Sequence, residues 1–201
     1  FYRRYRKRLT REDHIERLDR LLWEGRFYPE RRMYRRVNSN YRALAEARLV
    51  LRRMRGGVDR AIARVPIELQ SHPGLVYERL RWRRRKGRDL QARELLVDPP
   101  SDLIQPERWW RERAILARRA LQDGHISEAY DIAREHGLKS GAGFVEAEWL
   151  AGWIALRFLN EESDAYGHFA KVYRVSRYLV SRARGAYWAG RAAEVMDDTS
   201  R

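Results

Sequence analysis

Apolar residues recur along most of the chain at spacings of three and four, which is the period of an amphipathic helix. The segment after Thr10 illustrates the pattern, because Ile15, Leu18 and Leu22 share one face before Gly25 ends the periodicity. No segment alternates apolar and polar residues over the length of a strand. The pattern therefore predicts an all-α chain.

Helix start and stop signals divide the pattern into short helices. Thr10 and Asp13 have the spacing of a capping box, while Pro73 and Pro106 suit the first turn of a helix. Glycines follow most of the apolar runs, as expected at helix ends. The expected helices cover about residues 11–24, 29–37, 41–55, 58–64, 73–86, 89–96, 106–123, 126–136, 144–159, 163–175 and 181–194.

Three of these helix ends repeat at a nearly constant interval. Gly87, Gly124 and Asn160 each follow a helix and lie 37 and 36 residues apart. An apolar residue stands seven positions before each of these helix ends: Leu80, Ala117 and Trp153. An alanine stands five positions after each of them: Ala92, Ala129 and Ala165. Units of this length are typical of helical solenoids such as tetratricopeptide repeats. We therefore predict one αα-superhelical domain over residues 1–201, with its clearest repeats at 73–196.

The segment 181–194, with the sequence SRARGAYWAGRAAE, is unusually rich in small residues. Ser181 is expected to cap this helix. Its apolar residues form two stripes, the first Ala183, Ala186, Tyr187, Gly190 and Ala193, and the second Gly185, Trp188, Ala189, Ala192 and Val195. Two such stripes predict a helix that lies between neighbours on both sides. Arg182, Arg184 and Arg191 then require solvent or a carboxylate partner.

The composition describes a basic, folded protein. The formal net charge is +15, and Lys7, Lys86, Lys139 and Lys171 are the only lysines, so nearly all the basic residues are arginine. Such a charge attracts polyanions, whether nucleic acid, anionic lipid or an acidic cell-wall polymer, although arginines on solvated helix faces would give the same count. The chain has no cysteine, which excludes disulfides and thiolate metal sites. No apolar run is long enough to span a membrane.

The sequence contains no recognisable catalytic or cofactor motif. None of the histidines has a second histidine three or four residues away, so we expect surface or helix-end histidines and no metal site. The histidines are His14, His72, His125, His136 and His168. The segment 141–143 lacks the lysine of a phosphate-binding loop, and a serine nucleophile elbow is missing. No cofactor is therefore expected.

Two clusters, at residues 3–8 and 81–86, mix arginine with aromatic residues, as nucleic-acid-binding proteins also do. A stacking platform for bases must be exposed, whereas Trp82 is expected to face the core. We therefore predict no nucleic-acid partner.

Several segments resemble the helical domain of the soluble lytic murein transglycosylases of Gram-negative bacteria, particularly alphaproteobacterial members. The resemblance extends over nearly the whole chain and is carried by residues 10–23, 73–84, 107–113, 146–159 and 181–194. Its signature residues are Trp149, Trp153, Ser181, Arg182, Arg184, Tyr187, Trp188, Gly190 and Arg191. The resemblance implies a superhelical domain that precedes a lysozyme-like catalytic domain.

Enzymes of this family cleave the bond between N-acetylmuramic acid and N-acetylglucosamine in peptidoglycan and leave a 1,6-anhydro sugar. Their catalytic glutamate precedes a serine, as Glu162 precedes Ser163 here, but the phenylalanine and the glycine-leucine-methionine-glutamine segment that should follow are missing. Ser163 is instead expected to cap a helix. The resemblance thus implies a non-catalytic piece of a periplasmic enzyme, whose partners are peptidoglycan glycan strands and its own C-terminal catalytic domain. A chain that begins at Phe1 also suggests an excised piece from which a signal peptide has been removed.

The alternative is a cytoplasmic helical-repeat adaptor that binds protein or RNA. Repeat proteins that recognise RNA bases use polar residues at fixed positions of each unit. The residues that flank Gly87, Gly124 and Asn160 vary, which argues against such a code.

Overall fold

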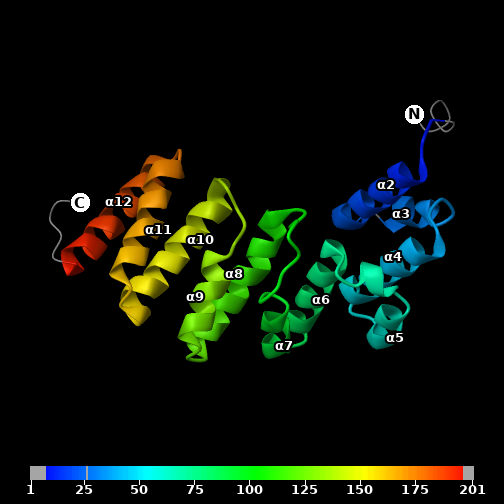
Figure 1. The fold of residues 1–201 in the computed structure, drawn as a ribbon, viewed down its shortest axis with the longest axis horizontal. Helices are drawn as coiled ribbons and strands as arrows, with labels where there is room; N and C mark the ends of the chain where they lie inside the picture. Colours follow the sequence, from blue (N-terminus) through cyan, green and yellow to red (C-terminus); the bar gives the residue numbers. More distant parts are fainter. Residues whose placement is uncertain (1–7, 26, 197–201) are drawn as a thin grey trace. The chain divides into compact units, whose positions relative to one another are not determined.

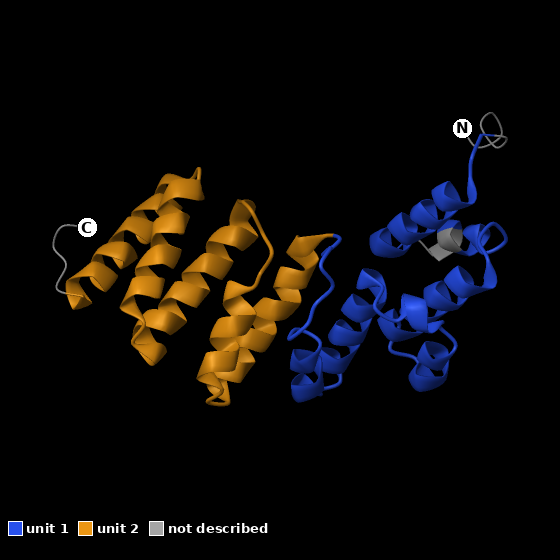
Figure 2. Ribbon diagram, in the orientation of Figure 1, with its two compact units in different colours: residues 1–104 blue, residues 105–201 orange. Residues whose placement is uncertain are grey.

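The computed structural model describes residues 8–25 and 27–196, and every regular element in these ranges is helical (Figure 1). The prediction of an all-α chain is therefore confirmed. Contacts divide the chain into two compact units, residues 1–104 and 105–201, which are described separately (Figure 2). None of the helices in the described ranges is long and apolar enough to cross a membrane.

The first unit consists of short helices whose apolar faces form two clusters. Its elements are α2 (Arg11–Glu24), α3 (Phe27–Met33), α4 (Ser39–Arg52), α5 (Val58–Ala63), the 3-10 turn η1 (Ile67–Leu69), α6 (Pro73–Arg85) and α7 (Asp89–Glu94). The helix α4 packs against α2, α5 and α6. Leu18, Leu22 and Ala45 belong to one cluster, whereas Leu51 and Leu75 belong to the other. Both clusters therefore form around α4.

A buried arginine links three helices of the first unit. Arg48 on α4 is 1% exposed, forms an ion pair with Asp19 on α2, and lies 5.3 Å from the centre of the Trp23 ring. Its guanidinium also occupies the space where a side chain at Gly74 on α6 would lie, because a Cβ there would overlap the guanidinium atoms of Arg48. The buried position of the Arg48 side chain thus depends on a glycine at position 74.

The second unit is a series of helices in which each packs against the next. Its elements are α8 (Pro106–Gln122), α9 (Ile126–Arg134), α10 (Gly141–Ile154), the π-helical turn η2 (Ala155–Leu159), α11 (Glu162–Val175) and α12 (Leu179–Val195). The helix α10 packs against α8, α9 and α11, and α11 also packs against α12. Fully buried alanines, among them Ala117, Ala129 and Ala165, let these helices approach closely.

The three predicted break residues all end helices in the left-handed conformation, with φ of 69° at Gly87, 82° at Gly124 and 54° at Asn160. At the first two, the amide after the break donates to a carbonyl five residues earlier: Arg88 N to Arg83 O at 2.9 Å, and His125 N to Ala120 O at 2.8 Å. This is the hydrogen bond of a Schellman motif. The alanines five residues after each break are all 0% exposed.

The third helix end contains one extra residue, which the sequence does not predict. The amide of Glu161 donates to Ala155 O at 3.1 Å, six residues earlier, because η2 is a π-helical turn. The counterpart of the buried Leu80 and Ala117 is therefore the buried Gly152. Trp153, which stands seven residues before Asn160 in the sequence, is only half-buried.

Other helix ends differ from expectation by a few residues. The helix α4 ends at Arg52, before the predicted Gly56 and Gly57, and Met54 adopts the left-handed φ of 57°. Ser163 is the second residue of α11, whose N-cap is Glu161, so its expected role as a cap is wrong.

The predicted capping box at Thr10 is confirmed and provides a first test. Thr10 Oγ1 accepts from Asp13 N at 3.2 Å, and Asp13 Oδ2 accepts from Thr10 N at 2.8 Å. Replacing Thr10 with alanine is expected to lower the free energy of unfolding by about 1 kcal/mol, because an amide of the first turn loses its acceptor. Urea unfolding followed by circular dichroism measures this loss.

The matched control for Thr10→Ala is Ser39→Ala. Ser39 is exposed in the first turn of α4, and among the described residues its hydroxyl bonds only the side chain of its neighbour Asn40. The control is expected to change stability by no more than about 0.5 kcal/mol. Equal losses in the two variants would contradict a specific role for the capping box.

Candidate functional site

Three of the predicted signature residues meet where α10, α11 and α12 pack together. The rings of Trp149 and Trp153, both on α10, stack with their centres 6.0 Å apart. Trp188 on α12 contacts Trp149 edge-on at 6.3 Å and stacks on Phe169 of α11 at 5.8 Å. We call these four residues the aromatic seam. All three indoles are half-buried, so the seam lies at the border between core and surface.

Two of the three signature arginines are held against aromatic rings. The Cζ atom of Arg184 lies 3.7 Å from the centre of the Trp149 ring, and that of Arg182 lies 5.0 Å from the Tyr173 ring. Arg191 instead pairs with Glu194 one turn later. Partial burial lowers the pKa of Arg184. Arg184 forms no ion pair with any residue in the part of the chain that the structure describes.

The remaining signature residues, Tyr187, Gly190 and Ser181, also lie on α12. Tyr187 is 62% exposed, Gly190 is exposed, and Ser181 is the third residue of the helix. The N-cap of α12 is Tyr178, whose amide donates to Ser176 Oγ at 3.2 Å, so the prediction of a cap at Ser181 is wrong. The helix α12 begins before the predicted Ser181 because the Ser176 side chain accepts the hydrogen bond that forms the preceding turn.

The prediction that α12 lies between neighbours on both sides is also wrong within the described residues. The second stripe packs against α11: Gly185 and Ala192 are buried there. In the first stripe, Ala183, Ala186 and Tyr187 are exposed, and only Ala193 is buried.

A second cluster of polar side chains, which the sequence did not predict, surrounds Glu148 on α10. His136 follows α9, His168 lies in the middle of α11, and Lys171 lies one turn further along α11. Both histidines are buried, at 5% and 8% exposure. His136 lies at a helix end as expected, whereas His168, inside α11, contradicts the expectation of a surface or helix-end histidine. Ligand spacing of three or four residues detects only groups on one helix, whereas His136, Glu148 and His168 come from three different segments. The sequence did contain one signal for this cluster. Glu148 is a carboxylate on a helix face that is otherwise apolar, formed by Phe144, Ala147 and Ala151.

Hydrogen bonds define the protonation of His136. Its Nδ1 accepts from Leu138 N at 2.9 Å, so the proton is on Nε2, which donates to Glu148 Oε1 at 3.3 Å. The other carboxylate oxygen, Oε2, lies 2.5 Å from His168 Nδ1, and Lys171 Nζ lies 3.3 Å from Oε1. One carboxylate thus joins α9, α10 and α11.

This environment keeps Glu148 ionised. Burial alone raises the pKa of Glu148, but the hydrogen bonds from His136 and His168 and the charges of His168 and Lys171 outweigh burial and lower it to about 2. A buried carboxylate with several donors is stable, whereas the same carboxylate without them would be costly.

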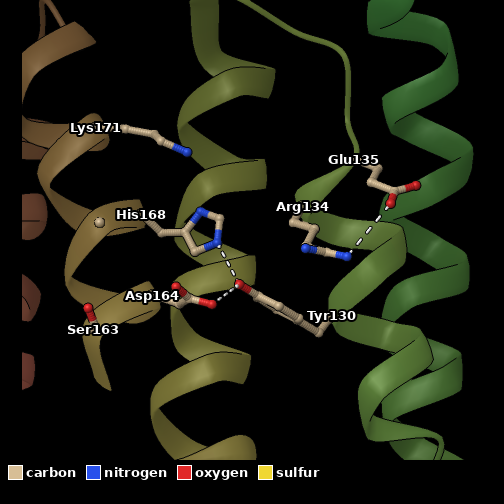
Figure 3. A pocket seen from close by; sticks show the side chains of 8 residues that line it. Tyr130, Arg134, Glu135, Ser163, Asp164, His168 and Lys171 are labelled. Atoms are coloured by element: carbon tan, nitrogen blue, oxygen red, sulfur yellow. Dashed lines mark hydrogen bonds and ion pairs between the residues drawn. The ribbon is translucent and has the colours of Figure 1, made fainter. Parts of the chain in front are cut away.

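His168 also lines an open pocket of about 430 Å³ (Figure 3). The pocket residues are Tyr130, Arg134, Glu135, Ser163, Asp164, Gly167, His168 and Lys171. Figure 3 shows the Tyr130 hydroxyl pointing between two partners, Asp164 Oδ2 at 3.3 Å and His168 Nε2 at 3.1 Å. Burial, followed by the charges of Asp164 and Glu161, raises the pKa of Tyr130 to about 12.

The chemistry of this pocket favours a structural role. The protein already engages both nitrogens of His168, Nδ1 through Glu148 and Nε2 through Tyr130, so neither is available to accept a proton from a ligand. The raised pKa keeps the Tyr130 phenol protonated at neutral pH and therefore a poor nucleophile. Among residues 8–25 and 27–196, no group of three or more histidines and carboxylates is arranged to hold a metal ion.

Comparisons with known proteins give no identification: no family model matches the chain, and no curated protein or solved structure is significantly similar to it.

Proposed function

We propose that this chain is the non-catalytic α-superhelical domain of a periplasmic peptidoglycan lytic transglycosylase, where it scaffolds the catalytic domain and holds anionic glycan strands. The observation that carries this proposal is the position of the charge. In the described residues, three buried arginines, Arg48, Arg93 and Arg113, are matched in number by the buried Glu78, Glu112 and Glu148. The net positive charge of the described residues is therefore carried by side chains that are not buried.

The superhelical part of the proposal rests on the repeated helix ends. Left-handed residues close α6, α8 and the α10–η2 segment at nearly constant intervals, and a buried alanine follows each of them. Within the second unit, α8 pairs with α9 and α10 with α11, so that α12 occupies the place of the first helix of a further pair. Stacked pairs of this kind are the building unit of helical solenoids.

An arginine-rich exterior suits the chemistry of peptidoglycan. The peptide stems and lactyl groups of the polymer carry carboxylates, and a guanidinium binds a carboxylate through two parallel hydrogen bonds. Many weak contacts along one polymer increase the overall affinity without a deep pocket. In this proposal, cleavage belongs to a separate lysozyme-like domain of the parent enzyme.

One observation favours the second candidate, a cytoplasmic adaptor that binds protein. Three apolar side chains at the start of α12, Tyr178, Leu179 and Val180, are 74%, 79% and 82% exposed. Clustered exposed apolar residues are typical of protein-binding surfaces.

Co-sedimentation with purified murein sacculi tests the first proposal. The chain is expected to sediment with sacculi at about 50 mM salt and to be released at about 500 mM, because its contacts are electrostatic. The sacculi should yield no 1,6-anhydromuropeptides, which chromatography would detect. A lack of retention at low salt, or release of anhydromuropeptides by the chain itself, contradicts the proposal.

A genetic observation separates the two candidates. Translation of the natural gene beyond the codon for Arg201 is expected to reveal a lysozyme-like domain with a glutamate-serine-x-phenylalanine segment. A stop codon directly after Arg201 would favour the adaptor.

A further inference from the structure

A groove of about 690 Å³ lies in the second unit, on the surface next to the aromatic seam. Its lining includes Trp149 and Glu146 from α10, Arg118 from α8, Arg177 and Tyr178 from the turn before α12, and Arg184 from α12. The groove is separate from the pocket at His168, with which it shares no residue. Elements distant in the sequence thus supply a concave surface with three arginines.

The groove contains two cations that the protein does not neutralise. Glu146 accepts from Arg118 Nη2 at 2.7 Å and from Trp110 Nε1 at 3.0 Å, so the charges of Glu146 and Arg118 cancel. Neither Arg177 nor Arg184 forms an ion pair with a residue in the described ranges. The lining therefore has an excess of two positive charges, which an anionic ligand would balance.

The geometry of Arg184 prepares it for a carboxylate. Its Cζ atom lies over the Trp149 ring, 3.7 Å from the ring centre, which is a cation–π contact. The N–H donors point outward in the plane of the guanidinium, so stacking leaves them free for two parallel hydrogen bonds. Because the ring restricts the side chain, less conformational entropy is lost on binding.

The same stacking argues against a ring-shaped ligand. Arg184 covers a face of Trp149, and Trp153 stacks on that indole as well. A sugar or a nucleic-acid base that binds by stacking needs an open aromatic face. Trp149 therefore offers little open face to a sugar ring or a base, whereas the two arginines that lack an ion pair within the described ranges favour a carboxylate.

We propose that the groove formed by Arg177, Arg184 and Trp149 binds a short acidic peptide, with a peptide carboxylate paired to Arg184 and a second to Arg177. The volume suits a segment of a few residues, and the apolar part of the lining accommodates its aliphatic side chains. The carboxylates come either from a peptidoglycan stem, a source that rests on the proposed function, or from an acidic protein segment.

Calorimetric titration of the full chain with four probes tests the proposal. The probes are a disaccharide-tetrapeptide muropeptide, its free acidic tetrapeptide, the same tetrapeptide with its carboxylates amidated, and an unrelated acidic peptide of the same length. The acidic probes are expected to bind and the amidated one is not. Tighter binding of the muropeptide than of an unrelated acidic peptide indicates the cell-wall source, and equal binding indicates an acidic protein segment. Binding of the amidated peptide equal to that of the acidic one overturns the proposal.

Variants locate the site. Arg184→Gln and Arg177→Gln are each expected to weaken binding of the acidic tetrapeptide by about tenfold, because each removes a charge-assisted pair. Arg184→Lys retains the charge but not the planar fork, so an intermediate loss is expected. The matched control is Arg182→Gln on the same helix: Arg182 lies over Tyr173, does not line the groove, and its loss is expected to change affinity less than twofold.

The outcomes separate this inference from the proposed function. Arg177 is exposed in a turn, so its replacement tests the groove without disturbing the core. Binding of the tetrapeptide by a chain that sacculi do not retain would contradict the proposed function and support the groove. The assignment would be overturned if Arg184→Gln and Arg177→Gln weakened binding of the tetrapeptide no more than Arg182→Gln does. It would also be overturned if an oligonucleotide displaced the tetrapeptide and its binding depended equally on Arg184.

Discussion

Replacement of Glu148 with glutamine is expected to lower the free energy of unfolding of the second unit at pH 7 by about 3 kcal/mol, because it leaves buried donors opposite a neutral amide. His136, His168 and Lys171 all contact this carboxylate. An amide is isosteric with the carboxylate, so the loss reports charge and hydrogen bonding and not a cavity. Urea unfolding, followed by tryptophan fluorescence and circular dichroism, measures the loss.

The pH dependence of this difference has a definite sign. The pKa of Glu148 is lowered from 4.5 to about 2 in the folded chain, so its stabilising contribution is complete above about pH 4.5 and disappears as the pH falls toward 2. The gap between the native chain and Glu148→Gln is therefore expected to be largest near neutral pH and to close in acid.

Glu146→Gln is the matched control for this experiment. Glu146 lies two residues earlier on α10, and its side chain is 47% exposed. It bonds Arg118 and Trp110, so its replacement is expected to cost about 1 kcal/mol. Similar losses at the two positions, or a gap that does not change between pH 7 and pH 2, would contradict the role assigned to Glu148.

Replacement of Gly185 with alanine is expected to destabilise the packing of α12 on α11 by about 2 kcal/mol or more. A Cβ at this position would lie 2.7 Å from Tyr173 N and 3.0 Å from Phe169 O. Both atoms belong to the backbone of α11, so no side-chain rotation relieves the overlap and the two helices must separate. Separation would also weaken the stacking of Phe169 on Trp188.

Gly190→Ala, on the same helix, is expected to change stability in the opposite direction. A Cβ at Gly190 meets nothing within 4 Å, and the residue is exposed in the interior of α12. Alanine is expected to stabilise the helix there by about 0.5–1 kcal/mol, because glycine has the lower helix propensity. Thermal unfolding of the two variants should therefore shift the Tm in opposite directions. Equal shifts would mean that helix propensity, and not contact with α11, controls both positions.

Much of the fold could be predicted because its signals are local. The capping box at Thr10 and the glycines at positions 25, 87 and 124 act within a single turn, and each ends or begins a helix where expected. The serines did not predict helix starts correctly. Ser163 and Ser181 both lie inside helices, since the turns that precede them are completed by other residues.

The candidate sites were predictable only where residues of one helix contribute. Trp149 and Trp153 lie four residues apart on α10 and stack as helical neighbours do. The Glu148 network joins residues that are 12 and 20 positions apart, and its geometry depends on how α9, α10 and α11 pack. The groove beside Arg184 likewise exists only once α8 and the turn before α12 have come together.

The π-helical turn at residues 155–159 affects how this chain should be aligned with others. An ungapped repeat alignment pairs Trp153 with Ala117, although Gly152 is the residue in the equivalent environment. Because each residue of an α-helix turns the chain by about 100° around the helix axis, an alignment without a gap assigns the residues before the turn to the wrong face. Phe158 then contacts the Trp153 ring with their centres 5.1 Å apart. A profile built from these units therefore needs a single-residue gap inside the last turn of its first helix.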